Sequence, residues 1–224
     1  MYTGKIRARE RSMPQVFARF YTVGALLWLL SPTRGLFVAI TSPSLLLTVA
    51  GAFLFHRGWN LRTVLWFAFI VVSAFCLEWA GVHDQRIFGR YAYGPGLAPL
   101  VDGTPLIIGL NWLWLVYASH DIAERLVRGT GFRILTGSIL MTGYDLALEW
   151  AAPAMRMWHF DGAYAPVRNF AVWFAAAVVY HSGAEVLAIR SDNRPARILF
   201  GIQVLFFLAI GLLAQIPVSY THLR

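Results

Sequence analysis

The chain is short of charged residues, and this shortage excludes an ordinary soluble domain. Asp, Glu, Lys and Arg make up only 13% of its 224 residues. Soluble domains average about 25% of such residues. With 58% hydrophobic residues and a mean hydropathy of +0.58, the chain has too little polar surface to cover a soluble fold. We therefore expect an integral membrane protein.

Cysteine and lysine are almost absent as well. Cys76 is the only cysteine, so an intramolecular disulfide and a cysteine-based metal motif are both excluded. Lys5 is the only lysine and lies near the N-terminus, so a helix lysine cannot hold retinal as a Schiff base. The chain also lacks a Walker-type Gly-Lys-Ser/Thr, a nucleophile elbow, a His-Glu-x-x-His and a dinucleotide glycine fingerprint.

What the chain does contain is a series of long apolar windows, each with about the 20 residues that a membrane-spanning helix needs. They lie at 16–31, 36–56, 61–82, 104–124, 132–152, 169–190 and 195–216. The windows predict an all-α, polytopic transmembrane bundle of about seven helices. We expect a single transmembrane domain over 16–216, preceded by a basic tail (1–15) and followed by a short tail (217–224).

The positive charges alternate with these windows. Thirteen of the 19 Lys and Arg residues fall on the side of the N-terminus and the other six on the opposite side. Because Lys and Arg collect in cytoplasmic loops, we expect a cytoplasmic N-terminus. This alternation also explains the net charge of +8 without nucleic acid. The expected partner is therefore the lipid bilayer.

Carboxylates gather on the side that is poor in arginine. Asp145 and Glu149 are four residues apart near the end of an apolar window, so they share one helix face. Two like charges so close favour a shared proton, and a carboxylic acid that is protonated at neutral pH is what a general acid requires. The structural alternative is that Glu149 pairs with Arg156 or Arg168 while Asp145 caps a neighbouring group.

A second acidic stretch ends the third window. Glu78 is followed about one turn later by His83 and Asp84, a spacing that lacks the i, i+4 histidine pair of helical zinc sites, so no metal is expected. A single acid among aromatic residues can deliver a proton. The alternative is an interfacial salt bridge from Glu78 to Arg86 or Arg90.

The two longest connections, about 83–103 and 153–168, lie on the same side as these acids. Both are rich in Gly, Pro and aromatic residues, which settle at the membrane interface, so we expect them to fold over the bundle. Asn169, at the start of the sixth window, is equally explicable as a helix N-cap. Carboxylates, aromatic rings and an apolar interior together suit acid chemistry on an apolar substrate dissolved in the membrane.

Five titratable residues lie toward the arginine-rich side instead: His120, Asp121, Glu124, His181 and Glu185. We expect structural pairing there, with Glu185 reaching Arg190 or an arginine of a neighbouring helix.

An ordered series of motifs spans residues 78–173, nearly half of the chain. The motifs read Glu78-x-x-Gly81-Val-His83, Phe88-Gly89-x-Tyr91-x-Tyr93, Pro105 with Trp112, Tyr144-Asp145-Leu146 with Leu148-Glu149, Trp158, Gly162-x-Tyr164, Asn169-Phe170 and Trp173. In their order and spacing the chain resembles the membrane carotenoid 1,2-hydratases of the CruF type. That family includes gamma-carotene 1'-hydroxylases and archaeal bisanhydrobacterioruberin hydratases. The chain departs from the pattern at Asp84-Gln85 and at Glu149, where we expect a small polar pair and an aspartate.

The resemblance implies a hydro-lyase of carotenoid biosynthesis in a bacterial or archaeal cell membrane. It would add water, without a cofactor, to the terminal isopropylidene double bond of an acyclic or monocyclic carotenoid of the lycopene or gamma-carotene type. The product is a tertiary alcohol. The catalytic residues implied are Asp145, Glu149, Glu78 and Asp84. The substrate-binding residues implied are Trp79, His83, Tyr91, Tyr93, Trp112, Trp158, Tyr164, Asn169 and Trp173.

Two other functions fit the same residues. A lycopene-cyclase-like membrane enzyme makes the same first protonation but quenches the cation with an internal alkene. A non-enzymatic carotenoid or isoprenoid binding or transport protein uses the acids for packing or proton coupling. Replacing both Asp145 and Glu149 by their amides separates these classes, because an enzyme loses turnover while substrate binding survives.

Overall fold

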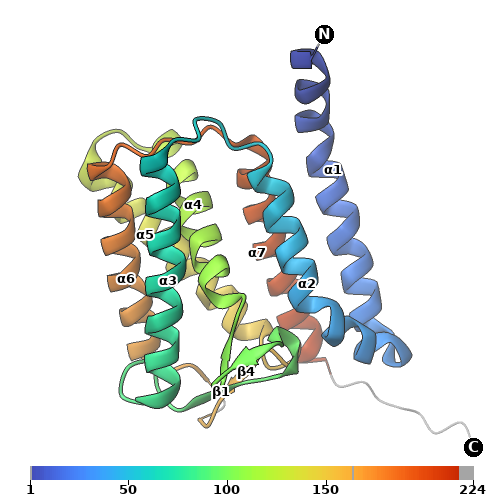
Figure 1. The fold of residues 1–224 in the computed structure, drawn as a ribbon. Coiled ribbons are helices and arrows are strands. Elements are labelled where there is room, and N and C mark those ends of the chain that lie inside the picture. Colours follow the sequence, from blue (N-terminus) through green and yellow to red (C-terminus); the bar gives the residue numbers. More distant parts are fainter. Residues whose placement is uncertain (1, 163, 217–224) are drawn as a thin grey trace, which may run out of the picture.

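The computed structural model describes residues 2–162 and 164–216, and within them the expected all-α bundle is confirmed (Figure 1). The helices in these ranges are α1 (Tyr2–Leu29), α2 (Arg34–Phe53), α3 (Leu61–His83), α4 (Ile108–Leu126), α5 (Thr130–Ala151), α6 (Val167–Val186) and α7 (Arg194–Ala214). Two single 3-10 turns, η1 (Ser31–Thr33) and η2 (Pro95–Leu97), lie in connections. The short tail expected at 217–224 lies outside the described residues.

Most helices begin and end within a few residues of the predicted windows. The side chain of Asn60 accepts a hydrogen bond of 3.0 Å from the backbone N–H of Thr63, which caps α3. Asn193 caps α7 in the same way, with Pro195 in the first turn. Two starts differ from the prediction. Helix α4 begins later because residues 104–105 form a strand, and α1 begins at Tyr2, so the expected basic tail is helical.

Within the described residues, three segments are long and apolar enough to cross a membrane by length and composition. They are Ser31–Phe53, Leu61–His83 and Arg194–Ala214. Charged side chains make several of the other helices less apolar: α4 carries Asp121 and Glu124, and α5 carries Asp145 and Glu149. These segments agree with the expected membrane protein, and the cytoplasmic position of the N-terminus remains a prediction.

Helix α4 forms the centre of the bundle. Every residue from Trp112 to Asp121 is buried, and the helix packs against α2, α3, α5, α6 and α7 (Figure 1). Helix α1 lies on the outside and packs mainly on α7 and α2. The close approach of α3 and α4 depends on Gly109, where a Cβ atom would lie 2.2 Å from the carbonyl oxygen of Val71.

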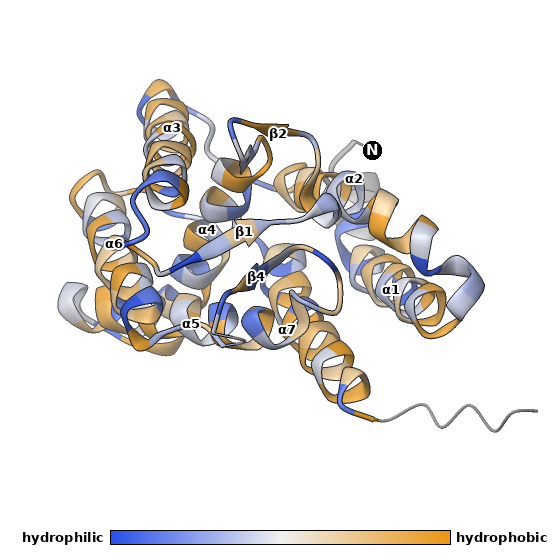
Figure 2. Cartoon of the chain, turned by 90° about the horizontal axis from the view of Figure 1, so that it is seen from below, coloured by the Kyte–Doolittle hydropathy of each residue, from blue (hydrophilic) through white to orange (hydrophobic). Residues whose placement is uncertain are grey.

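The two long connections meet across one end of the bundle, as expected. Strand β1 (Tyr91–Tyr93) pairs antiparallel with β4 (Trp158–Phe160), so that Tyr93 faces Trp158 (Figure 2). The chain after β1 packs closely on the second connection, because a Cβ atom at Gly94 would lie 2.4 Å from the carbonyl oxygen of Arg156. A second small pair, β2 (Leu100–Val101) with β3 (Thr104–Pro105), completes this covering layer.

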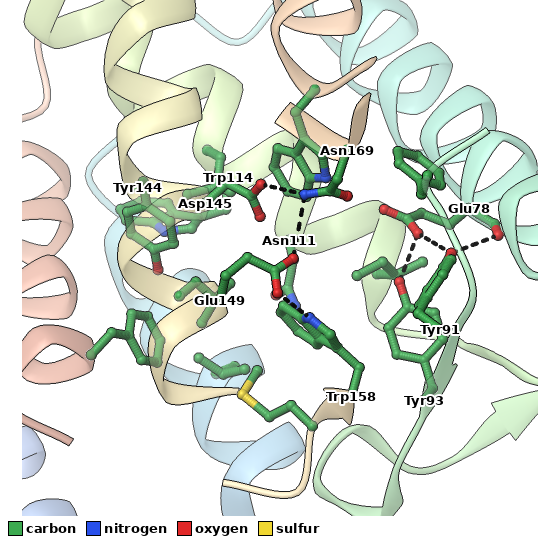
Figure 3. A pocket seen from close by; sticks show the side chains of 18 of the residues that line it. Glu78, Tyr91, Tyr93, Asn111, Trp114, Tyr144, Asp145, Glu149, Trp158 and Asn169 are labelled. Atoms are coloured by element: carbon green, nitrogen blue, oxygen red, sulfur yellow. Dashed lines mark hydrogen bonds between the residues drawn. The ribbon is translucent and has the colours of Figure 1, made fainter. Parts of the chain in front are cut away.

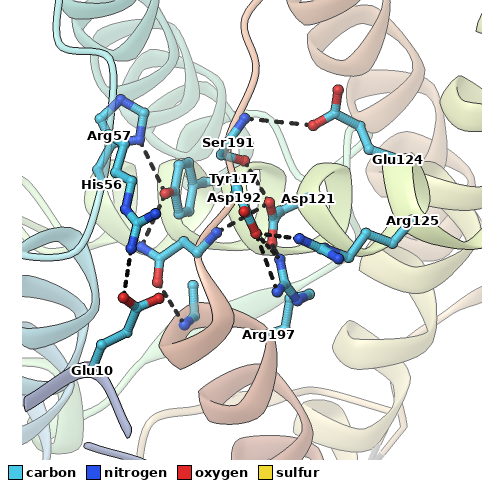
Figure 4. A network of polar contacts seen from close by, with 12 residues as sticks. Glu10, His56, Arg57, Tyr117, Asp121, Glu124, Arg125, Ser191, Asp192 and Arg197 are labelled. Atoms are coloured by element: carbon cyan, nitrogen blue, oxygen red, sulfur yellow. Dashed lines mark hydrogen bonds and ion pairs between the residues drawn. The ribbon is translucent and has the colours of Figure 1, made fainter. Parts of the chain in front are cut away.

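At the end of the bundle opposite the strands, ion pairs link the helices and connections (Figure 4). Arg197 Nη1 lies 2.5 Å from Asp121 Oδ2, which joins α7 to α4. Arg125 pairs with Asp192, and Arg57 lies 2.6 Å from Glu10.

The pairing expected for Glu185 is confirmed, because its carboxylate lies 3.3 Å from Arg190 and 3.6 Å from Arg133. Glu124 lies 3.1 Å from the same Arg190. The acids of the arginine-rich end therefore hold helices together.

Candidate functional site

A cavity lies beneath the paired strands (Figure 3). Its lining comes from α2 to α7 and from both strands and is largely apolar and aromatic. The polar or titratable side chains in the lining are Glu78, Tyr91, Tyr93, Asn111, Tyr144, Asp145, Glu149, Asn169 and Gln203. A largely apolar lining with a few convergent polar groups is typical of sites for small ligands.

Asp145 and Glu149 point into this cavity from one face of α5 and share a single amide. Asn169 Nδ2 donates hydrogen bonds to Asp145 Oδ2 at 3.1 Å and to Glu149 Oε1 at 3.4 Å (Figure 3). Asp145 is 0% exposed, and its second oxygen, Oδ1, has no hydrogen-bond partner among the described residues. A buried carboxyl oxygen without a donor is costly unless it carries a proton or meets a ligand.

The structure contradicts two alternatives considered from the sequence: Asn169 as a helix N-cap and an ion pair between Glu149 and Arg156 or Arg168. Helix α6 begins at Val167, so Asn169 lies inside its first turn and bonds the two acids instead of capping the helix. Glu149 has no ion pair with Arg156 or Arg168 in the described part of the chain. It accepts a hydrogen bond of 3.0 Å from Trp158 Nε1.

Glu78 occupies the other side of the cavity, and both of its carboxylate oxygens accept hydrogen bonds. Its Oε2 accepts from the hydroxyls of Tyr91 at 2.9 Å and Tyr93 at 2.7 Å, and its Oε1 accepts from Trp112 Nε1 at 2.9 Å. The two tyrosines are alternate residues of β1, so both side chains leave the strand on the same face. Three neutral donors suit a carboxylate, which only accepts hydrogen bonds.

The strand tyrosines remain donors at ordinary pH. Burial, and next the negative charge of Glu78, raise the pKa of Tyr91 and of Tyr93 above the usual value for a phenol. Both hydroxyls therefore stay protonated and oriented toward the carboxylate.

Aromatic rings form much of the cavity wall. Trp173 lines the cavity and stacks on Trp112, with ring centroids 4.0 Å apart and planes inclined by 24°. Trp112 thus lies behind the wall and joins this ring to Glu78. Trp158 lies near the other acids, at the strand pair. A cation formed in the cavity would meet π-faces, which attract positive charge.

Besides Trp112, four residues named from the resemblance do not line this cavity. Asp84 is exposed, and its Oδ1 accepts a hydrogen bond of 3.0 Å from the backbone N–H of Arg86 in the turn after α3. Trp79 Nε1 and His83 Nε2 lie 2.9 and 3.0 Å from the same oxygen of Asp102 at the surface.

The fourth residue, Tyr164, is 84% exposed on the outside of the bundle. Chain geometry accounts for two of these positions. Helix α3 ends at His83, so Asp84 leaves its axis, and Tyr164 stands in the connection beyond β4.

Sequence reasoning missed a polar network next to the cavity. Gln203 Oε1 accepts from Trp114 Nε1 at 2.8 Å and from the Tyr144 hydroxyl at 2.9 Å. Its amide donates to the Tyr21 hydroxyl at 2.6 Å. A lone glutamine in the apolar run of α7 was the available signal, because such residues hydrogen-bond across membrane helices.

Asn111 is a further polar residue of the lining. Within the described part of the chain its side-chain amide has no hydrogen-bond partner. The amide is therefore available to a molecule in the cavity.

One group of described residues has the composition of a metal site, and it lies at the opposite end of the bundle. Ligand atoms of His120, Glu124 and Glu185 lie within 4.8 Å of one another. Both carboxylates already pair with Arg190, and a guanidinium this close opposes a second cation. This group is separate from the cavity.

Comparison with known proteins gives one result for this chain. The family model described as "Carotenoid biosynthesis protein" matches residues 38–221, which include all the cavity carboxylates. No curated protein and no solved structure matched the chain.

Proposed function

We propose that this chain, which belongs to the carotenoid biosynthesis protein family, is a carotenoid 1,2-hydratase of the CruF type. It adds water to the terminal isopropylidene double bond of an acyclic carotenoid end. One observation carries the proposal: Asp145 and Glu149 share the Asn169 amide in an apolar, aromatic-walled cavity. Hydration of an alkene needs an acid and a base at one carbon–carbon bond, and this pair can supply both.

In the first step Asp145 is the acid. Its Oδ1 is the carboxyl oxygen that no described residue engages, so it is free to hold a proton toward the cavity. That proton adds to the less substituted alkene carbon. The π-electron pair forms the new C–H bond and leaves a tertiary carbocation on the other carbon. Asp145 becomes a carboxylate.

The carbocation is stabilised by the fixed groups around it. Trp173, stacked on Trp112, and Trp158 offer π-faces to the cation. Glu78, held by three donors, supplies a negative charge that needs no rearrangement when the cation forms. We place Glu78 in this electrostatic role because its oxygens are already engaged.

In the second step Glu149 is the base. A water molecule attacks the cationic carbon through its oxygen lone pair, and Glu149 accepts the proton that the water loses. The free amide of Asn111 can orient this water. A proton then returns from Glu149 to Asp145, one helical turn away, and both acids regain their starting states. The net change is the addition of one water molecule to form a tertiary alcohol.

The experiment is expression in cells that accumulate lycopene, followed by mass spectrometry of the pigments. A mass gain of one water per reacting end, absent from cells with an empty vector, supports hydration. An isomeric pigment of unchanged mass would instead indicate a cyclase. Unchanged pigment that copurifies with the protein would indicate a binding or transport protein.

A further inference from the structure

A second hollow lies on the outer side of α5 and α7, next to the cavity. Residues of the connection after α5, including Pro153 and Ala154, line it at the strand end of the bundle. We call it the lateral groove. Glu149 and Phe160 line both the groove and the cavity, so these two side chains stand between the two spaces.

The groove is mostly apolar. Its walls include Leu146 and Trp150 of α5 and Val204 and Leu208 of α7. Leu146 is 60% exposed on this face, so in a membrane it contacts lipid tails. On the side of the groove next to the cavity, its wall contains the carboxylate of Glu149, which accepts a hydrogen bond of 3.0 Å from Trp158 Nε1.

We propose that this groove holds the polyene chain of the substrate, which threads its end past Glu149 into the cavity. The inference rests on the proposed function, because it takes the substrate to be a carotenoid. A long, rigid polyene cannot fit whole into the cavity, so its chain must leave through an opening. The lateral groove provides an apolar opening on the lipid side, and a membrane-dissolved molecule can enter it without crossing water.

Gly143 makes the groove testable without disturbing the fold. It lies on the groove wall, and a Cβ atom there would meet nothing within 4 Å. Phenylalanine at this position therefore projects into the groove without a clash in the bundle. Gly131 of the same helix has equally open surroundings but does not line the groove, which makes it a matched control.

The experiment compares wild-type protein, Gly143→Phe and Gly131→Phe, each purified in lipid nanodiscs from lycopene-accumulating cells. The readout is total bound pigment per protein, measured by absorbance. We expect Gly143→Phe to lose most of its pigment while Gly131→Phe keeps the wild-type ratio. Equal pigment in all three proteins, an equal loss in both variants, or a wild-type protein without pigment would each overturn the groove assignment.

The same cells separate this inference from the proposed function. Pigments extracted from them report whether wild-type protein adds water. A wild-type protein that binds pigment through the groove but forms no hydrated product would refute the hydratase function and leave the groove assignment intact. If the wild-type protein forms hydrated product and Gly143→Phe keeps unchanged binding and turnover, the groove assignment would be refuted and the hydratase function would stand.

Discussion

Replacing Asp145 by asparagine removes the proposed proton donor and little else. The side-chain carbonyl oxygen of asparagine can still accept the 3.1 Å hydrogen bond from Asn169 Nδ2. The new amide nitrogen then takes the place of Oδ1, which has no described partner in the native protein either. An unpaired buried polar group costs about 1–3 kcal/mol, and because one is present before and after the change, the loss of stability should stay below that range.

The loss of turnover should be much larger. A positioned general acid or base contributes about 10²–10⁴-fold to a rate. That range corresponds to about 3–5 kcal/mol of transition-state stabilisation. The assay is the initial rate of hydrated product formed by purified Asp145→Asn in nanodiscs, measured by chromatography with mass detection, together with its Tm. A folded variant that retains turnover close to the wild-type rate would refute the role of Asp145.

Asp84→Asn is the matched control for this experiment. It is the same chemical change at the same end of the bundle, but Asp84 is exposed and engages the backbone of Arg86 outside the cavity. Surface changes of this kind usually stay within about 0.5 kcal/mol, so turnover should remain within about twofold of the native rate. A loss as deep as that of Asp145→Asn would return Asp84 to the catalytic set.

Three further outcomes are expected. Glu149→Gln should lower turnover by about 10²-fold or more while pigment still binds, measured as product rate against bound pigment; an unchanged rate would refute its role as base. The raised pKa of Tyr93 means that its hydrogen bond to Glu78 stabilises the fold fully below about pH 10 and is lost as pH rises toward the folded-state pKa, so the Tm difference between the wild type and Tyr93→Phe should be constant to that pH and shrink above it; a difference that shrinks from near neutral pH would contradict this. Gly109→Ala should destabilise the bundle by about 1–3 kcal/mol, seen as a lower Tm, because its Cβ atom would lie 2.2 Å from a Val71 backbone oxygen that cannot move aside; an unchanged Tm would contradict the close packing.

The helical architecture was predictable because long apolar windows indicate membrane helices, and the alternation of arginines between them supports their number. The predicted starts of two helices were wrong. Residues 104–105 are apolar enough to extend a helix window, yet they pair as a strand with Leu100 and Val101. The basic segment before residue 16 was expected as a tail, yet α1 begins at Tyr2, since charge alone does not end a helix.

The candidate site was predictable in part. The spacing of Asp145 and Glu149 places them on one helix face, and this required only the helical period. Their partners required knowledge of the tertiary fold. Trp158 reaches Glu149 from a strand whose pairing with β1 depends on both long connections. Asn169 reaches both acids because α6 packs against α5.

The misplaced residues show the same limit. His83 and Asp84 follow Glu78 by about one and a half helical turns, but Glu78 faces the cavity from within α3, whereas the other two lie at the surface where α3 ends. Spacing cannot show where a helix stops. The network around Gln203 was overlooked because a single amide in an apolar run identifies no partner until the helices are packed.

The most direct test of the proposed reaction follows the two parts of the added water. Purified protein is given lycopene in water enriched in heavy oxygen and, separately, in deuterium oxide, and the product is analysed by mass spectrometry and NMR. Hydration by Asp145 and Glu149 predicts one solvent oxygen in the new tertiary hydroxyl and one solvent deuterium on the neighbouring carbon. A hydroxyl oxygen derived from dissolved dioxygen, or a product with solvent deuterium but no added oxygen, would contradict it.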